Sequence, residues 1–290
     1  MKIALTGGNG LLGGALINSL MQDGHSFLLI DRNLMWSSSI DGLARVFSTC
    51  DCIIHCAANT DVEYCEIDIE SCFNDNYLLT EKIARAASHS KIKLVFISST
   101  GIYGKNKLNP YFEFDPSFPT TNYHKSKYLA EQIVTIANVD NLIIRTGWLF
   151  GGELSKPKNF VGRRIEDAKI SLKKGFDLKA NSEQKGNPSF VDDISSRVLL
   201  MIKEGCSGLY NCVNSGFASR FDYVSEIIRL CKISIFIEPA EGSFFSRKAL
   251  VSENEMAFNW KMKAHSFVEM PHWSESLENY INKTYHKSIR

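Results

Sequence analysis

The sequence has almost no excess of charge of either sign. Its 290 residues include 33 Lys and Arg and 32 Asp and Glu, which gives a formal net charge of +1. A chain without a basic bias has no bulk electrostatic attraction for nucleic acid or for an anionic membrane surface. We therefore expect neither kind of partner.

Long apolar runs and metal-ligand patterns are also missing. No stretch approaches the roughly 20 apolar residues of a membrane span, and the short apolar run at 3–5 passes straight into glycines rather than into a signal peptide. None of the eight cysteines forms a Cys-x-x-Cys pair, and the seven histidines show no metal-ligand spacing. We expect a cytoplasmic protein with buried free thiols and no metal site.

The chain does contain a glycine-rich loop between an expected strand at 3–6 and an expected helix from about residue 14. Gly7, Gly10 and Gly13 form a Gly-x-x-Gly-x-x-Gly pattern, with Leu11 and Leu12 inside it. Glycines let the backbone approach a pyrophosphate, and the helix N-terminus offers free N–H groups to the anion. This order predicts a dinucleotide-binding loop, and a tight turn without a ligand is the alternative.

An acidic residue follows the second expected strand, 27–30. Asp31 lies about 20 residues beyond the loop, where a carboxylate binds the adenosine ribose of NAD. Arg32 is the next residue, and its side chain is long enough to bind the additional 2′-phosphate of NADP. We favour NAD(H) and keep NADP(H) open, with a simple turn role for Asp31 as the alternative.

The third expected strand, from Cys52, runs into Ala57 and Ala58, which are small enough for a dinucleotide to lie against. His55 has apolar neighbours, and we interpret it as a packed core residue rather than a catalytic base. Asn76 opens a helix and is expected beneath the cofactor.

Tyr123 and Lys127 are four residues apart and so share one face of an expected helix. An ammonium group one turn away favours the phenolate and lowers the tyrosine pKa, which suits proton exchange with a carbonyl/alcohol couple. Upstream, the hydroxyls at 98–100 leave a strand at 93–98, at the sheet edge where doubly wound folds bind ligands. A tyrosine and a lysine at this spacing often lie on an exposed helix without a catalytic role. The catalytic interpretation therefore depends on the other motifs.

Together these motifs resemble the extended short-chain dehydrogenases/reductases and, within them, the dTDP-4-dehydrorhamnose reductases. The matching stretches are 6–13, 57–63, 97–104, 123–127, 145–151, 159–161 and 186–193. The resemblance implies a triad of Ser99, Tyr123 and Lys127, with Ser99 identified by its spacing from the Tyr-Gly at 103–104. It also implies that Ser99 bonds the substrate carbonyl, that Tyr123 donates the proton, and that Lys127 binds the nicotinamide ribose.

The same resemblance implies that Thr60, Val62, Thr100 and Trp148 contact the substrate, with Trp148 stacking on the sugar. A core role is the alternative for that tryptophan. The sequence also departs from the family pattern: His124 replaces the usual Gly, Gly147 the common Ser, and Arg247 lacks the Pro that normally follows it. By the same resemblance, 4,6-dehydratases carry Asp-Glu directly after the triad hydroxyl and GDP-fucose synthases carry a Cys at the position of Gly101, and a glycine supplies neither chemistry. Plain reduction, or epimerisation by the 4-keto route with the same triad, remains open.

We expect an α/β fold: a doubly wound Rossmann parallel sheet over 1–150, and a smaller substrate-binding lobe over 151–290 with parts that return to the first domain. The expected function is NAD(P)H-dependent reduction of the 4-keto group of a nucleotide-activated 6-deoxysugar. An NAD-dependent nucleotide-sugar epimerase and a non-catalytic regulatory subunit are the alternatives. The base, the sugar stereochemistry and the oligomeric state stay open, although a homodimer is common in related folds.

Overall fold

The computed structural model describes residues 1–104 and 107–286. Six strands within these residues form one parallel sheet in the order β10-β5-β4-β3-β1-β2. The strand order reverses between β1 and β3, so their carboxyl ends form the switch point where such sheets bind ligands. The strands are β1 (Lys2–Thr6), β2 (Ser26–Ile30), β3 (Cys52–His55), β4 (Lys93–Ser99), β5 (Leu142–Thr146) and β10 (Gly208–Asn211).

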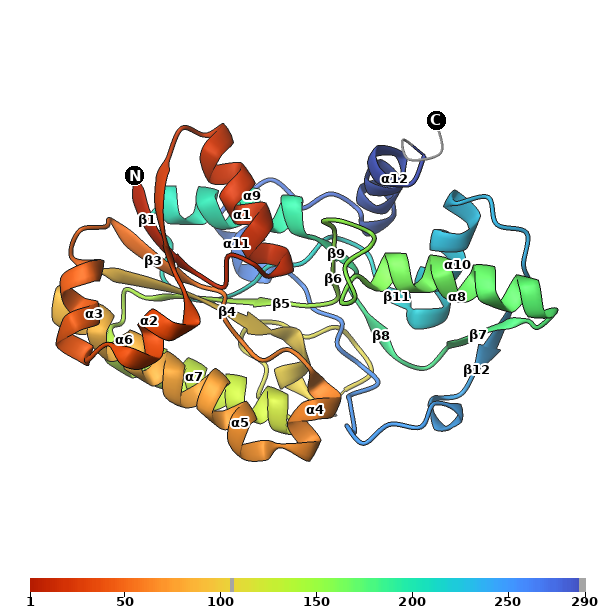
Figure 1. Cartoon of the computed structure of the whole chain (residues 1–290), viewed down its shortest axis with the longest axis horizontal. Helices are drawn as coiled ribbons and strands as arrows, with labels where there is room; N and C mark the ends of the chain where they lie inside the picture. Colours follow the sequence, from red (N-terminus) through yellow and green to blue (C-terminus); the bar gives the residue numbers. More distant parts are fainter. Residues whose placement is uncertain (105–106, 287–290) are drawn as a thin grey trace.

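Helices cover both faces of this sheet (Figure 1). One face packs on α1 (Leu11–Gln22), α9 (Val191–Lys203) and α11 (Trp260–Ala264). The other packs on α3 (Ile40–Phe47), α6 (Leu79–Ser90) and α7 (Asn122–Ala137). Helices on both faces of a parallel sheet confirm the predicted doubly wound α/β fold. Shorter helices follow β2 and β3: α2 (Arg32–Ser37), α4 (Val62–Ile67), α5 (Ile69–Phe73) and a π-helical turn (Asn74–Leu78).

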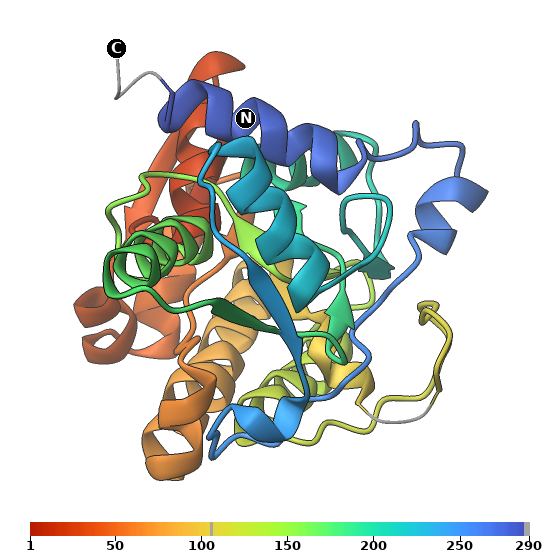
Figure 2. The ribbon, with the colours of Figure 1, turned by 90° about the vertical axis from the view of Figure 1, so that its right-hand side faces the viewer.

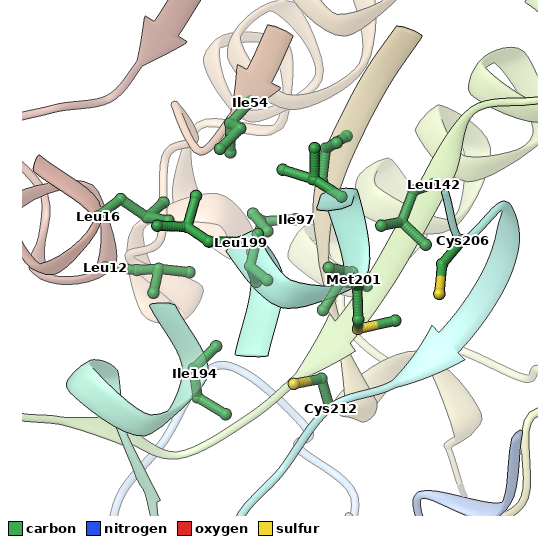
Figure 3. Packing of buried hydrophobic residues seen from close by; sticks show 14 of the residues in the cluster. Leu12, Leu16, Ile54, Ile97, Leu142, Ile194, Leu199, Met201, Cys206 and Cys212 are labelled. Carbon is green, nitrogen blue, oxygen red and sulfur yellow. The ribbon is translucent and has the colours of Figure 1, made fainter. Parts of the chain in front are cut away.

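The core beneath α1 and α9 joins residues that are far apart in the sequence. Leu16 of α1, Ile97 of β4 and Leu199 of α9 belong to one buried cluster (Figure 3). Cys206 and Cys212 lie in the same cluster, and all eight cysteines are free, with only Cys56 partly exposed. These thiols therefore act as small apolar residues, as the sequence predicts.

A second lobe, which faces the viewer in Figure 2, is built from helices and short strand pairs. Its helices, α8 (Phe160–Lys174), α10 (Arg220–Leu230) and α12 (Trp273–Thr284), share one buried cluster. Helix α10 begins at Arg220, because Ser219 and Asp222 form a capping box there. The strand pairs are β6 (Leu149–Phe150) with β9 (Ser189–Phe190), β7 (Leu178–Asn181) with β12 (Ile237–Ala240), and β8 (Lys185–Gly186) with β11 (Ala218–Ser219).

The second half of the chain also contributes to the large sheet. Strand β10 pairs with β5, and α9 packs against α1. No helix in the described part of the chain combines the length and the apolar character needed to cross a membrane. The boundary at residue 150 stays a prediction.

Candidate active site

A cleft of about 1860 Å³ lies along the carboxyl ends of β1, β3, β4 and β5, between the sheet and the second lobe. Its walls include the glycine loop, the segment after β3, the ends of β4 and β5, and the start of α7. The second lobe contributes side chains from around α8 and α10. The cleft is therefore large enough for two ligands of nucleotide size.

The glycine loop is as tight as its pattern predicts. Gly7 has a left-handed backbone (φ +72°), and a Cβ there would lie 2.6 Å from the backbone nitrogen of Ala57. A Cβ at Gly13 would lie 2.1 Å from the Gly7 carbonyl oxygen. Helix α1 begins after Gly10 without a side-chain cap, so its first N–H groups are available to an anion. The loop thus fits the pyrophosphate of a dinucleotide, and Leu11 and Leu12 line the cleft beside it.

At the expected adenosine end, Asp31 and Arg32 have different environments. The Asp31 carboxylate accepts a hydrogen bond from the Leu34 N–H (2.7 Å) and caps α2. Among the described residues that line the cleft, Arg32 is present and Asp31 is not. The Arg32 guanidinium bonds the Asp75 carboxylate at 2.7 Å and stays 67% exposed. A cation therefore faces the cleft here, and the carboxylate expected to bind the ribose is engaged in a helix cap.

The segment after β3 forms the next part of the wall. Ala57, Ala58, Thr60 and Val62 line the cleft. Asn76 is fully buried, and its side-chain amide bonds both the N–H (2.7 Å) and the carbonyl (3.1 Å) of Asn59. Asn76 thereby holds the Asn59 backbone, which is part of the cleft wall, in place. Asn76 itself is not among the described residues that line the cleft.

His55 is fully buried between two threonine hydroxyls, at 2.6 Å from Thr6 and 3.0 Å from Thr80. Burial lowers its pKa to about 3. A neutral imidazole with both nitrogens bonded fits the packed core residue that the sequence favours.

Ser99, Tyr123 and Lys127 all line the cleft. Ser99 ends β4, and its hydroxyl accepts the Gly101 N–H at 3.3 Å. Tyr123 lies in the first turn of α7, which Thr121 caps, and Lys127 lies one turn further along. The fold therefore brings a hydroxyl, a phenol and an amine from two elements into the lining of one cleft.

The electrostatics of this group differ from the sequence-based expectation. Burial, followed by the neighbouring thiols of Cys65 and Cys72 and the carboxylate of Glu255, raises the pKa of Tyr123. Burial also lowers the pKa of Lys127 to about 7, against the opposing effects of Cys56 and Glu131. The expected lowering of the tyrosine pKa is thus absent, because the amine is itself desolvated and only partly charged at neutral pH.

Thr100 and Trp148 were both expected at the substrate. Thr100 is 1% exposed and packs beneath Gly147, where a Cβ would lie 2.3 Å from its hydroxyl. This contact explains why a glycine replaces the usual serine at 147. Thr100 is not among the described residues that line the cleft.

Trp148 does line the cleft, with a left-handed backbone (φ +47°). Its indole N–H donates to the Glu255 carboxylate (3.0 Å), and the Arg220 guanidinium lies 3.4 Å from the ring centre. Sequence reasoning missed Glu255 and Arg220. The only available signal was that a buried indole N–H needs an acceptor, which does not indicate where the acceptor lies in the chain.

Residues 1–286 match the family model described as RmlD substrate binding domain. The chain is 25% identical over 284 residues to the spore coat polysaccharide biosynthesis protein SpsK of Bacillus subtilis, with 97% of each chain covered. It superimposes on a dTDP-4-dehydrorhamnose reductase of Clostridium acetobutylicum with a TM-score of 0.90 and 28% identity, over 98% of this chain and 99% of that one.

A dTDP-4-dehydrorhamnose reductase of Bacillus anthracis, solved in complex with NADP, superimposes with a TM-score of 0.90 and 26% identity, over 98% of this chain and 99% of that one. These similarities extend over nearly the whole chain and confirm the resemblance seen in the sequence motifs. The chain belongs to the RmlD substrate-binding-domain family.

Proposed function

We propose that this chain reduces the 4-keto group of a nucleotide-activated 6-deoxysugar. The observation that carries the proposal is the convergence of Ser99, Tyr123 and Lys127 on the cleft that also holds the glycine loop. When bound, a nicotinamide cofactor supplies the hydride. The Ser99 hydroxyl orients the carbonyl by a hydrogen bond, and the Tyr123 phenol donates a proton to the carbonyl oxygen.

The protonation states support this direction of transfer. A raised pKa keeps Tyr123 a protonated phenol, which is the form able to donate. Lys127 has a pKa of about 7, so it exchanges protons readily at neutral pH one helical turn from the phenol. Lys127 is only 2% exposed, so its amine is shielded from water.

The relatives support the substrate class. The two superimposed structures are of dTDP-4-dehydrorhamnose reductases, and SpsK is named as a spore coat polysaccharide biosynthesis protein. Basic side chains that line the cleft match a nucleotide diphosphate, which needs cationic partners. They include Lys158, Arg163 and Arg247.

For the cofactor, we infer that NADP(H) is used at least as well as NAD(H). Arg32 faces the cleft at the adenosine end, and a guanidinium binds a phosphate bidentately. The preference for NAD(H) rested on the Asp31 carboxylate, which is engaged in capping α2. The Bacillus anthracis relative was solved with NADP. A homodimer and a cytoplasmic location remain predictions.

The test is oxidation of NADH or NADPH, followed at 340 nm, against a panel of nucleotide 4-keto-6-deoxysugars generated in place. Cofactor oxidation with one of them is the expected result and would identify the base, the sugar and the preferred cofactor. If no substrate consumed cofactor, reduction would be the wrong function. NAD released on denaturation would then indicate the epimerase, and its absence the regulatory subunit.

A further inference from the structure

His124 follows the proposed proton donor directly, yet it does not point to solvent. Its side chain is 4% exposed and lines the cleft. The imidazole ring lies 5.0 Å from the Tyr123 ring, at an angle of 63°. Two neighbouring residues at the start of one helix therefore contribute rings to the same end of the cleft.

The ring is held in place from two sides. The Thr121 hydroxyl lies 2.9 Å from Nδ1 and accepts the His124 backbone N–H at 3.2 Å. On the opposite side the ring occupies the space in front of Gly101, where a Cβ would lie 2.1 Å from Nε2. Any side chain at 101 would displace the imidazole, so Gly101 and His124 form a matched pair.

The hydrogen bonds assign the tautomer. The Thr121 hydroxyl hydrogen has no acceptor other than Nδ1 among the described residues, so we assign the ring proton to Nε2. Burial lowers the pKa of His124, and the carboxylates of Glu255 and Glu66 only oppose this effect, so the ring is neutral. No residue in 1–104 or 107–286 is hydrogen-bonded to Nε2. A nearly buried N–H that lacks a protein partner and lines a ligand cleft is available to donate a hydrogen bond to an acceptor on the ligand.

We propose that His124 determines sugar specificity by donating a hydrogen bond from Nε2 to the C3 hydroxyl of the substrate. This inference rests on the proposed function. Ser99 and Tyr123 fix where the carbonyl lies, and His124 packs between the phenol and the loop that follows Ser99. In a 4-keto-6-deoxyhexose the adjacent carbons are C3, which bears a hydroxyl, and C5, which bears the methyl group and the ring oxygen. Only C3 offers a free hydroxyl next to the carbonyl.

The experiment compares two substrates with matched variants. The substrates are the nucleotide 4-keto-6-deoxyhexose that the wild type reduces and its 3-deoxy analogue, with NADPH oxidation as the measurement. His124→Phe keeps the ring and removes the donor, His124→Gln restores a donor, and Lys125→Ala changes an exposed neighbour in the same helical turn.

We expect the wild type to prefer the hydroxylated substrate about tenfold in kcat/KM, since a site built to bond a hydroxyl rejects the analogue that lacks it. His124→Phe should lose about tenfold on the hydroxylated substrate and change less than about twofold on the analogue. His124→Gln should recover part of the loss, and Lys125→Ala should match the wild type on both. Thermal unfolding and NADPH fluorescence check that each variant folds and binds cofactor.

Equal losses on both substrates, or no loss on either, would show that His124 only fills space and would overturn the inference. The wild-type comparison needs no variant, so equal kcat/KM on the two substrates would overturn it even if His124→Phe did not fold. A wild type that reduces neither substrate would instead refute the proposed function.

Discussion

The amine of Lys127 lies 4.0 Å from the centre of the Phe96 ring, with the side chain 2% exposed. In the unfolded chain this amine titrates near its ordinary value of 10.5, whereas burial lowers its pKa to about 7 in the fold. Between these values the unfolded state binds more protons than the folded one. The free energy of unfolding therefore rises with pH in this window.

We predict a rise of about 2 kcal/mol in the free energy of unfolding between pH 7 and pH 9 from this group alone. Urea unfolding at several pH values measures it, with Lys127→Met as the matched variant. The methionine variant should lack this rise and should also lose activity. The same pH slope in both proteins would show that Lys127 titrates normally in the fold.

Tyr123→Phe should lower turnover by about 10²- to 10⁴-fold, because the variant lacks the proton donor while the rest of the cleft is intact. Cofactor binding, measured by NADPH fluorescence, should change little. Tyr128→Phe, in the same helix α7, is the matched control and should keep turnover. A Tyr123→Phe turnover within about twofold of wild type would contradict the proton-transfer role.

Arg32→Ala should raise the KM for NADPH by about tenfold or more and leave the KM for NADH nearly unchanged, because only NADPH carries the phosphate that the guanidinium would bind. Arg45→Ala changes an exposed arginine on α3 and serves as the control. Steady-state kinetics with both cofactors provide the measurement. Equal changes for NADH and NADPH would remove the basis for a phosphate contact at Arg32.

Asp31→Ala should lower the free energy of unfolding by about 1 kcal/mol, since the carboxylate caps α2. Asp31→Ser keeps a capping oxygen and removes the charge, so it separates the cap from any ribose contact. If the serine variant loses NADH affinity while it keeps its stability, the carboxylate also serves the cofactor, as the sequence suggests.

Gly147→Ser introduces the residue common in the family and should destabilise this chain by about 1–3 kcal/mol, because its Cβ would lie against the Thr100 hydroxyl. Thr100→Ala removes that hydroxyl. The double variant Thr100→Ala/Gly147→Ser should therefore recover most of the loss, as measured by urea unfolding. Strict additivity of the two single changes would show that the contact does not matter.

The features that could be predicted well from the sequence are those whose pattern depends only on residues close together in the chain. The glycine loop, the buried strands and the spacing of Tyr123 and Lys127 depend on neighbours within a few residues. Local spacing could not reveal how strongly Lys127 is desolvated, because the Phe96 ring that covers it comes from β4. The partner of Trp148 was hidden for the same reason, since Glu255 lies 107 positions away.

His124 shows the same limit in another form. The sequence shows that His124 departs from the family pattern. It does not show that the imidazole points into the cleft, because this orientation depends on the absence of a side chain at Gly101. The role of Asp31 depended on α2 starting directly at Arg32, which makes the aspartate a helix cap. A position in a motif therefore predicted proximity to the cleft better than it predicted what each side chain contacts.

The pairing of β10 with β5 has a consequence for synthesis of the protein. Translation delivers β5 more than sixty residues before Gly208–Asn211 can cover it. Until then a nascent chain that already holds the glycine loop, Tyr123 and Lys127 displays an unpaired strand edge, which invites association with other chains. Early termination near residue 150 should thus yield aggregating fragments, and ribosome-bound intermediates of that length should need chaperone protection.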